Sequence, residues 1–216
     1  MEKSKLNVKK DNSVYYISLA VTLLIVLWGL LAPSNFEKVG NGVFSFLVNE
    51  FGWFYTLSMS SFVIFAVWIG FFSKYKDIRL GPDDSKPEYS NISWFAMLFS
   101  AGMGIGLVFW GAAEPLNHFM APLGVEAGTE AAKEFAVSKS FLHWGLHPWA
   151  NYSVLALALA YMQFRKNKPG LISSVFIPLL GEDVVSGWAG KLIDILAVFA
   201  TVAGVATSLG RSIIQI

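Results

Sequence analysis

Two short stretches of the sequence carry residue types that a binding site inside a membrane would need. The first is SAGMGIGLVFWGAAEP at 100–115, with four glycines within ten positions and a final Glu114-Pro115. Each glycine inside a helix costs roughly 1 kcal/mol relative to alanine, so a segment that only crossed lipid would not accumulate them. Glycines let a helix unwind, and the freed amides and carbonyls can bind a substrate or an ion. The alternative is a packing face, because Gly102 and Gly106 have the spacing of a GxxxG helix-contact motif.

The second stretch, HWGLHPWANY at 143–152, gathers three aromatic rings around a proline. On one continuous helix, Tyr152 would lie in angle between Trp144 and Trp149. Because Pro148 cannot donate to the Trp144 carbonyl, we expect a kink there and a polar backbone group beside the rings. Three converging rings suit a quaternary ammonium group, which makes no hydrogen bonds and is attracted by roughly 0.5–2 kcal/mol per ring. The alternative is an aromatic belt at the membrane interface.

Other polar side chains near these stretches have two interpretations each. His143 and His147 stand four apart on one helix face and resemble a two-histidine metal pair, for which only His118 and Glu114 are available as further ligands. Hydrogen-bonding histidines at a helix interface are the simpler interpretation, and we predict no metal site. The carboxyl group of Glu114 either couples an ion to transport or caps and pairs at the membrane edge. The hydroxyl groups of Thr201, Thr207 and Ser208 lie near the end of the chain. They either bind a sodium ion or hydrogen-bond back to their own helix.

The composition is that of an all-α polytopic membrane protein. Of 216 residues, 55% are hydrophobic and 14% are charged, and the mean hydropathy is +0.54, which is far above that of ordinary soluble chains. A net charge of +1 argues against a nucleic-acid partner. The absence of cysteine excludes a disulfide framework, a thiolate nucleophile and any cysteine-ligated metal.

The apolar runs predict five transmembrane helices, at 14–31, 51–72, 93–111, 139–164 and 192–209. The connections between them are a short segment at 34–49, a polar loop at 73–91 and an outer connection at 112–138. A short apolar stretch at 169–180, broken by Pro178, reads as an interfacial helix. Lysine and arginine are most frequent in the N-terminal tail, the second connection and the fourth, which predicts a cytoplasmic N-terminus.

Taken together, these residues resemble the betaine/choline/carnitine transporter family (BCCT), which carries or exchanges quaternary ammonium compounds with sodium or protons. The glycine run with Glu114-Pro115 and the aromatic stretch at 143–152 are similar to motifs of that family, as are LGPDDSKPEY at 80–89 and PGLISS at 169–174. The methionine in Gly102-Met103-Gly104 is more typical of the sodium-coupled betaine carriers.

The resemblance implies the N-terminal five transmembrane helices of an incomplete LeuT-type fold, which has two preliminary helices and two five-helix inverted repeats. The implied organisation is a cytoplasmic tail at 1–13, two preliminary helices at 14–72, a cytoplasmic loop at 73–92, and at 93–216 the first three helices of repeat one. Family members continue with further helices, so we expect a chain of this length to be a truncated carrier.

The resemblance also assigns site residues by position. Substrate would be bound by Trp144, Trp149 and Tyr152, together with Gly102, Met103, Gly104 and Gly106. One sodium ion would be bound around Ser100, Ala101 and Met103, and Thr201 matches a position that some sodium-coupled members use for a second sodium ion. One turn after Thr201, where some sodium-coupled members have another hydroxyl, this sequence has Val205, which departs from the pattern of a second sodium site.

The resulting hypothesis is a non-enzymatic, multi-pass cell-membrane importer of a quaternary ammonium osmolyte, with glycine betaine preferred over choline or carnitine. Sodium is the expected coupling ion, no cofactor is expected, and the family suggests a homotrimer. The alternatives are a truncated, non-transporting membrane product, a proton-coupled or exchange-type carrier, and a membrane metalloenzyme that uses the histidines.

Overall fold

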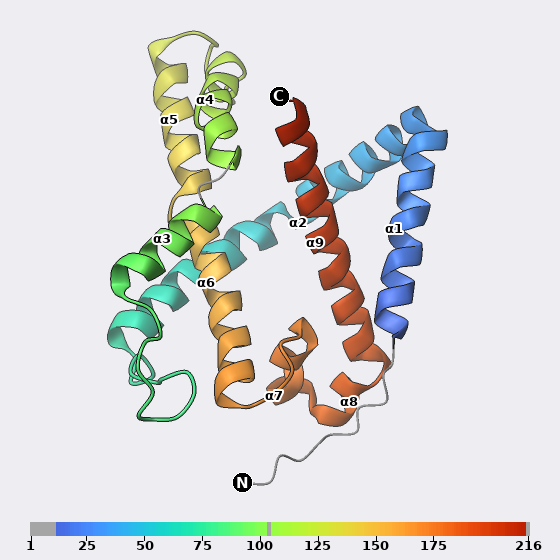
Figure 1. Ribbon diagram of the computed structural model, residues 1–216. Helices are drawn as coiled ribbons and strands as arrows, with labels where there is room; N and C mark the ends of the chain where they lie inside the picture. Colours follow the sequence, from blue (N-terminus) through green and yellow to red (C-terminus); the bar gives the residue numbers. More distant parts are fainter. Residues whose placement is uncertain (1–11, 103–104, 215–216) are drawn as a thin grey trace. The chain divides into compact units, whose positions relative to one another are not determined.

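The computed structural model describes residues 12–102 and 105–214, and every regular element within them is helical (Figure 1). The chain divides into two compact units. One consists of residues 1–52 and 168–206, and the other of residues 53–167 and 207–216. Each unit is described by itself below.

The chain opens with two helices that meet at a proline. α1 (Ser13–Leu31) ends where Ala32 adopts φ −142° and ψ 62°, as expected for a residue that precedes proline. Pro33 then begins α2 (Pro33–Val67), because proline is favoured at the first helical position, where no N–H is needed. The predicted end of the first helix before Pro33 is confirmed.

α2 is much longer than the sequence predicted, and it continues into the π-helical turn η1 (Trp68–Phe72). Residues 34–49, predicted as a short connection, are part of α2, so that prediction is wrong. After Pro33 there is no proline until Pro82. Gly40 and Gly42 each cost the helix roughly 1 kcal/mol, which is too little to end it.

Short helices follow one another in the first unit before its long final helix. They are η3 (Ile172–Phe176), a 3-10 turn, then α7 (Ile177–Leu180) and α8 (Glu182–Ser186). The long helix is α9 (Trp188–Ile214), of which residues 188–206 belong to this unit. Pro178 lies in the first turn of α7, so the predicted short helical character of 169–180 is confirmed from residue 172 onward. α9 contains the predicted 192–209 helix and begins four residues earlier.

In the second unit, the described residues of the glycine-rich segment are helical. α3 (Asn91–Gly102) and α4 (Ile105–Met120) flank Met103 and Gly104, which lie outside the described residues. α4 continues through Pro115 to Met120, so the predicted connection at 112–138 is wrong in its first third.

Half of the rest of that predicted connection is also helical, because α5 (Glu130–Trp144) begins within it. Thr129 caps α5, since its Oγ1 accepts a hydrogen bond from the Ala132 amide at 3.2 Å. The loop is thus reduced to residues 121–129, and α4 and α5 pack side by side as a helical hairpin (Figure 1).

The predicted single span at 139–164 is divided at Gly145 between α5 and α6 (Leu146–Ala160), which ends in the π-helical turn η2 (Tyr161–Arg165). The predicted kink at Pro148 is displaced by three residues. Pro148 lies in the first turn of α6, where its missing N–H costs nothing. At Gly145 a side-chain Cβ would lie 2.4 Å from the Phe141 carbonyl oxygen, so the break requires glycine.

Three helical stretches among the described residues are long and apolar enough to cross a membrane: Ser13–Leu31, Pro33–Phe72 and Trp188–Gly210. The predicted span at 139–164 is made of two shorter helices, and the predicted span at 93–111 includes two residues outside the described part of the chain. An all-helical membrane protein is thereby supported, while the five-span LeuT-type arrangement and the cytoplasmic N-terminus remain predictions.

Candidate functional site

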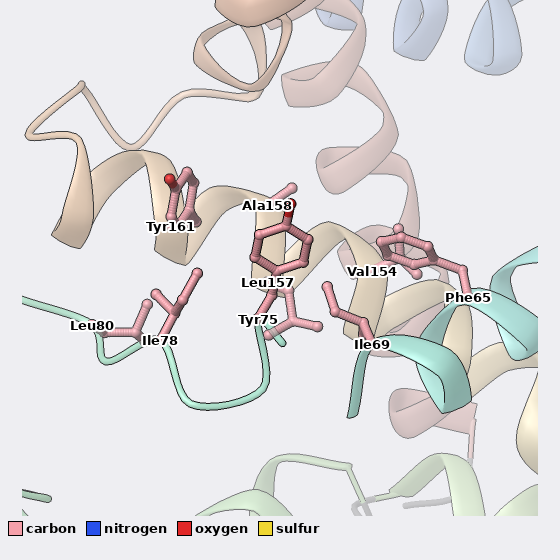
Figure 2. Close-up of a pocket in the computed structure, with 9 residues that line it drawn as sticks. All are labelled: Phe65, Ile69, Tyr75, Ile78, Leu80, Val154, Leu157, Ala158 and Tyr161. Atoms are coloured by element: carbon pink, nitrogen blue, oxygen red, sulfur yellow. The ribbon is translucent and has the colours of Figure 1, made fainter. Parts of the chain in front are cut away.

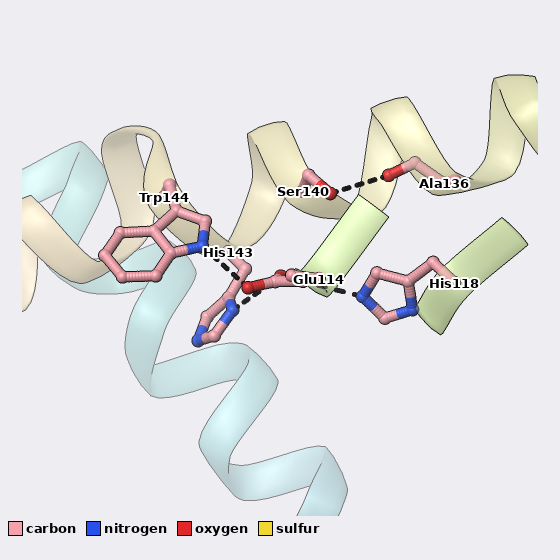
Figure 3. A network of polar contacts seen from close by, with 6 residues as sticks. All are labelled: Glu114, His118, Ala136, Ser140, His143 and Trp144. Atoms are coloured by element: carbon pink, nitrogen blue, oxygen red, sulfur yellow. Dashed lines mark hydrogen bonds and ion pairs between the residues drawn. The ribbon is translucent and has the colours of Figure 1, made fainter. Parts of the chain in front are cut away.

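A buried carboxyl group joins α4 to α5 in the second unit (Figure 3). Glu114 on α4 is only 6% exposed. Its Oε2 accepts a hydrogen bond from Trp144 Nε1 at 2.7 Å, and its Oε1 lies 2.7 Å from His143 Nδ1. His118, one turn further along α4, places Nε2 3.6 Å from the same Oε1. Both oxygens of the carboxyl group are therefore used within the α4–α5 hairpin.

Small residues on α5 allow this hairpin to close. Ala132 and Ala136 are buried against the neighbouring helix, and small side chains let two helices approach closely. On the same face His118 meets the edge of Phe135, with ring centroids 6.0 Å apart. The Ser140 hydroxyl donates to the Ala136 carbonyl at 2.8 Å (Figure 3). The alanine spacing thus brings Glu114 within reach of the last turn of α5.

The chemistry of this cluster is that of a hydrogen-bond acceptor held by two ring N–H groups. An indole nitrogen only donates, so the Trp144 bond fixes Glu114 as the acceptor, and His143 donates to it when Nδ1 carries the proton. The break at Gly145 places His143 on α5 and His147 on α6, so the assumption that both share one helix face is wrong. In the described part of the chain, no group of His, Cys, Asp and Glu is arranged to hold a metal ion.

Two of the three predicted substrate rings contact each other on α6. The centroids of Trp149 and Tyr152 lie 5.9 Å apart at an interplanar angle of 39°, and the side chains are 42% and 68% exposed. Trp149 Nε1 donates to the Trp144 carbonyl at 3.0 Å. The prediction of a polar backbone group beside the aromatic rings is confirmed, although the carbonyl is freed by the helix break at Gly145 and not by Pro148.

The third ring is oriented differently from the prediction. The angular relation between Trp144 and Tyr152 assumed one helix through 144–152, and the break at Gly145 removes that basis. The Trp144 indole lies beside His143, with ring centroids 5.5 Å apart, and its N–H points to Glu114. Trp144 is linked to the Trp149–Tyr152 pair through its backbone carbonyl.

The other predicted binding residues are only partly described. Ser100, Ala101 and Gly102 form the last turn of α3, Gly106 lies in the first turn of α4, and Met103 and Gly104 fall outside the described residues. Thr201 donates to the Ala197 carbonyl of its own helix at 2.8 Å, as the back-bonding alternative predicted. Ser100 and Thr201 belong to different units, so the sodium site stays a prediction.

Comparison with known proteins places the chain in a family. Residues 13–216 match the family model described as the betaine/carnitine/choline family transporter. The chain belongs to this family. It is 54% identical over 208 residues to a probable glycine betaine transporter of Desulfitobacterium hafniense, an alignment that covers 96% of this chain and 42% of that protein.

Two further relatives extend the comparison. The glycine betaine transporter OpuD of Bacillus subtilis is 51% identical over 210 residues, covering 96% of this chain and 40% of that protein. The ectoine/hydroxyectoine transporter of Virgibacillus pantothenticus is 45% identical over 217 residues, covering 100% of this chain and 42% of that protein. The chain spans about two fifths of the length of these relatives.

A second buried carboxyl group in this family member was not assigned a role from its sequence. Asp194 on α9 is 9% exposed. Its Oδ1 accepts from the Ser173 amide at 2.9 Å and its Oδ2 from the Ser173 hydroxyl at 2.8 Å. It thereby ties the PGLISS segment at 169–174 to α9. The available signal was an acidic residue inside an apolar span, which needs a polar partner.

An apolar cavity of about 450 Å³ also lies in the second unit (Figure 2). Its walls come from the end of α2, η1, the following loop and the α6–η2 helix: Phe65, Ile69, Tyr75, Ile78, Leu80, Val154, Leu157, Ala158 and Tyr161. The side-chain polar atoms of its lining are the hydroxyls of the two tyrosines, and no lining residue carries a positive charge to pair with the carboxylate of a zwitterionic solute. Beyond it, Arg165 bonds to Asp83 and to the Gly81 carbonyl, both at 2.6 Å.

Proposed function

We propose that this chain provides part of the binding site of a secondary transporter that imports a quaternary ammonium osmolyte, glycine betaine before choline or carnitine. Membership of the family supports this proposal, as do three helices of membrane-spanning length and relatives named as glycine betaine transporters. The proposed activity is that of the whole protein, because the relatives extend well beyond the aligned region.

The observation that carries the proposal is the exposed Trp149–Tyr152 pair. The indole N–H of Trp149 is already bonded to the Trp144 carbonyl, so the ring is held in orientation without any contribution from a ligand. A trimethylammonium group has no N–H to donate and gains roughly 0.5–2 kcal/mol from each ring face. A pair of fixed and accessible rings therefore suits this headgroup better than a primary amine, which would require an acceptor.

The carboxylate of the substrate and the coupling ion are proposed to lie at the glycine run. Amides near Gly102, Met103, Gly104 and Gly106 would bind the carboxylate, as unwound helix segments do in other transporters. Sodium is proposed as the coupling ion, with Ser100, Ala101 and Met103 as ligands of one ion and Thr201 as a ligand of a second; proton coupling and exchange are the alternatives. A homotrimer is proposed from the family resemblance. Because one relative is named as an ectoine/hydroxyectoine transporter, ectoine is a competing substrate.

Uptake of radiolabelled glycine betaine by cells that express the gene, in a host without betaine uptake of its own, tests the proposal. Trp149→Ala should raise KM about 2- to 30-fold, which corresponds to the cation–π attraction of one ring. Trp53→Ala is the matched control, because Trp53 is also exposed and its ring meets that of its neighbour on α2. An unchanged KM in Trp149→Ala would rule out the aromatic site.

Coupling and specificity are measured in the same cells. Replacing external sodium by potassium at constant osmolality and pH should abolish accumulation, whereas uptake that persists and follows the proton gradient would overturn sodium coupling. Excess unlabelled glycine betaine should compete more strongly than choline, carnitine or ectoine. Stronger competition by ectoine would assign this protein to the other kind of relative.

A further inference from the structure

The buried carboxyl group of Glu114 has no part in the transport cycle as proposed above. Only two charged side chains are buried among the residues whose burial is described, Glu114 and Asp194. Burying a charge is costly unless it is hydrogen-bonded. Glu114 meets this condition through ring N–H groups that lie 29 and 30 residues away on α5. The buried Glu114 carboxyl group on α4 is therefore held beside the end of α5, where the aromatic stretch begins.

Trp144 bonds both to Glu114 on α4 and to Trp149 on α6. It is the last residue of α5, next to the break at Gly145. Its indole N–H is held by Glu114 at 2.7 Å, and its carbonyl holds the indole N–H of Trp149 at 3.0 Å. A continuous path thus runs from the Glu114 carboxyl group through Trp144 to Trp149 and its ring partner Tyr152.

We propose that Glu114 is a positioning residue for the aromatic site: it fixes Trp144, and through the Trp144 carbonyl it fixes the orientation of Trp149. This inference rests on the proposed function for its consequence, the affinity for a quaternary ammonium group. Glu114 itself does not touch the substrate. Because His143 and Trp144 are the last two residues of α5, their ring contacts with Glu114 hold the end of α5 against α4, and with it the backbone carbonyl to which Trp149 donates.

Two other roles for Glu114 make different predictions. A simple tie between α4 and α5 would change the amount of folded protein and leave the affinity of the folded fraction unaltered. A coupling carboxylate would change the dependence of uptake on the external ion. A positioning residue instead raises KM, keeps the maximal rate per folded molecule, and changes the environment of the Trp149 indole, which it does not contact.

The first measurement is the indole ¹⁵N–¹H spectrum of the purified protein, in which the eight tryptophans give separate signals. The variants Trp144→Phe and Trp149→Phe each remove one signal and so supply the two assignments. Glu114→Ala should move both the Trp144 and the Trp149 signals. Glu114→Gln, which keeps an amide oxygen as acceptor, should move them less. Glu130→Ala is the matched control, because Glu130 is exposed on α5 and pairs only with Lys133, and it should move neither signal.

The second measurement is uptake, normalised to folded protein. Glu114→Ala should raise KM for glycine betaine about 10-fold, within the range of a hydrogen bond to a charged group, and Glu114→Gln should raise it less. In a Trp144→Phe background, which lacks the indole N–H, Glu114→Ala should raise KM little further. An unmoved Trp149 signal, or a lower maximal rate at constant KM, overturns the inference. If the unmodified protein takes up no betaine, the proposed function fails, and the two indole signals alone decide whether Glu114 positions the rings.

Discussion

The buried bond between Asp194 and Ser173 provides the sharpest test of how the first unit is held together. Asp194→Ala removes the acceptor for two donors at once, the amide and the hydroxyl of Ser173. Ser173 is only 4% exposed, so water does not readily replace the lost acceptor. We expect the segment around η3 to open from α9 much more often in this variant.

The magnitude follows from the number of donors left without a partner. Each buried, unpaired donor costs about 1–3 kcal/mol, which gives about 2–6 kcal/mol for two. Removing the carboxyl group also removes the cost of burying it, so we expect a net loss in the lower part of this range, about 2–4 kcal/mol. Asp194→Asn keeps one oxygen for the Ser173 amide and should lose about 1 kcal/mol.

Hydrogen exchange measured by mass spectrometry, on protein in lipid nanodiscs, reports this opening directly. The exchange rate of the Ser173 amide should rise by about 30- to 900-fold in Asp194→Ala, and by less in Asp194→Asn. Asp183→Ala is the control, because Asp183 is an exposed carboxylate on α8 in the same segment. A Ser173 amide that exchanges as slowly in Asp194→Ala as in the unmodified protein would refute the reasoning.

Two further predictions concern the second unit. Gly145→Ala should destabilise the protein by about 1–3 kcal/mol, because its Cβ would meet the Phe141 carbonyl oxygen at 2.4 Å. The matched control is Gly111→Ala on α4, where a Cβ would have nothing within 4 Å. Thermal unfolding in detergent compares the two variants, and an equal melting temperature would contradict the required glycine. Arg165→Lys should lose the paired bonds to Asp83 and Gly81 and speed tryptic cleavage after Lys76 and Arg79. Lys133→Ala, an exposed pair partner, should leave that cleavage rate unchanged.

The parts of the fold that the sequence predicted are those decided locally. α1 ends before Pro33 because proline restricts the residue that precedes it. Thr201 bonds back to its own helix, an interaction that spans only four residues. The Trp144 carbonyl lies beside the rings because it accepts from Trp149, only five residues along the chain. Each outcome depends on neighbours within one turn, and such neighbours can be read from the sequence.

The parts of the fold that the sequence did not predict depend on competing local preferences or on contacts between residues far apart in the chain. Residues 34–49 are too polar for a span, yet nothing in them outweighs the continuation of α2. The break at Gly145, three residues before the obvious proline, depends on a close approach to the Phe141 carbonyl. The partners of Glu114 lie on another helix about thirty residues away, and no periodicity in the sequence relates them.

The way in which the indoles are held has a consequence for substrate selection. Trp144 donates to a carboxyl oxygen and Trp149 to a backbone carbonyl, so both indole N–H groups are already used within the protein. A ligand at these rings therefore meets only their faces and edges, which attract a cation without hydrogen-bonding to it. A primary ammonium group needs acceptors, and it would leave its donors unpaired at such faces. The ring orientation set by protein bonds is thus what would favour a fully methylated nitrogen.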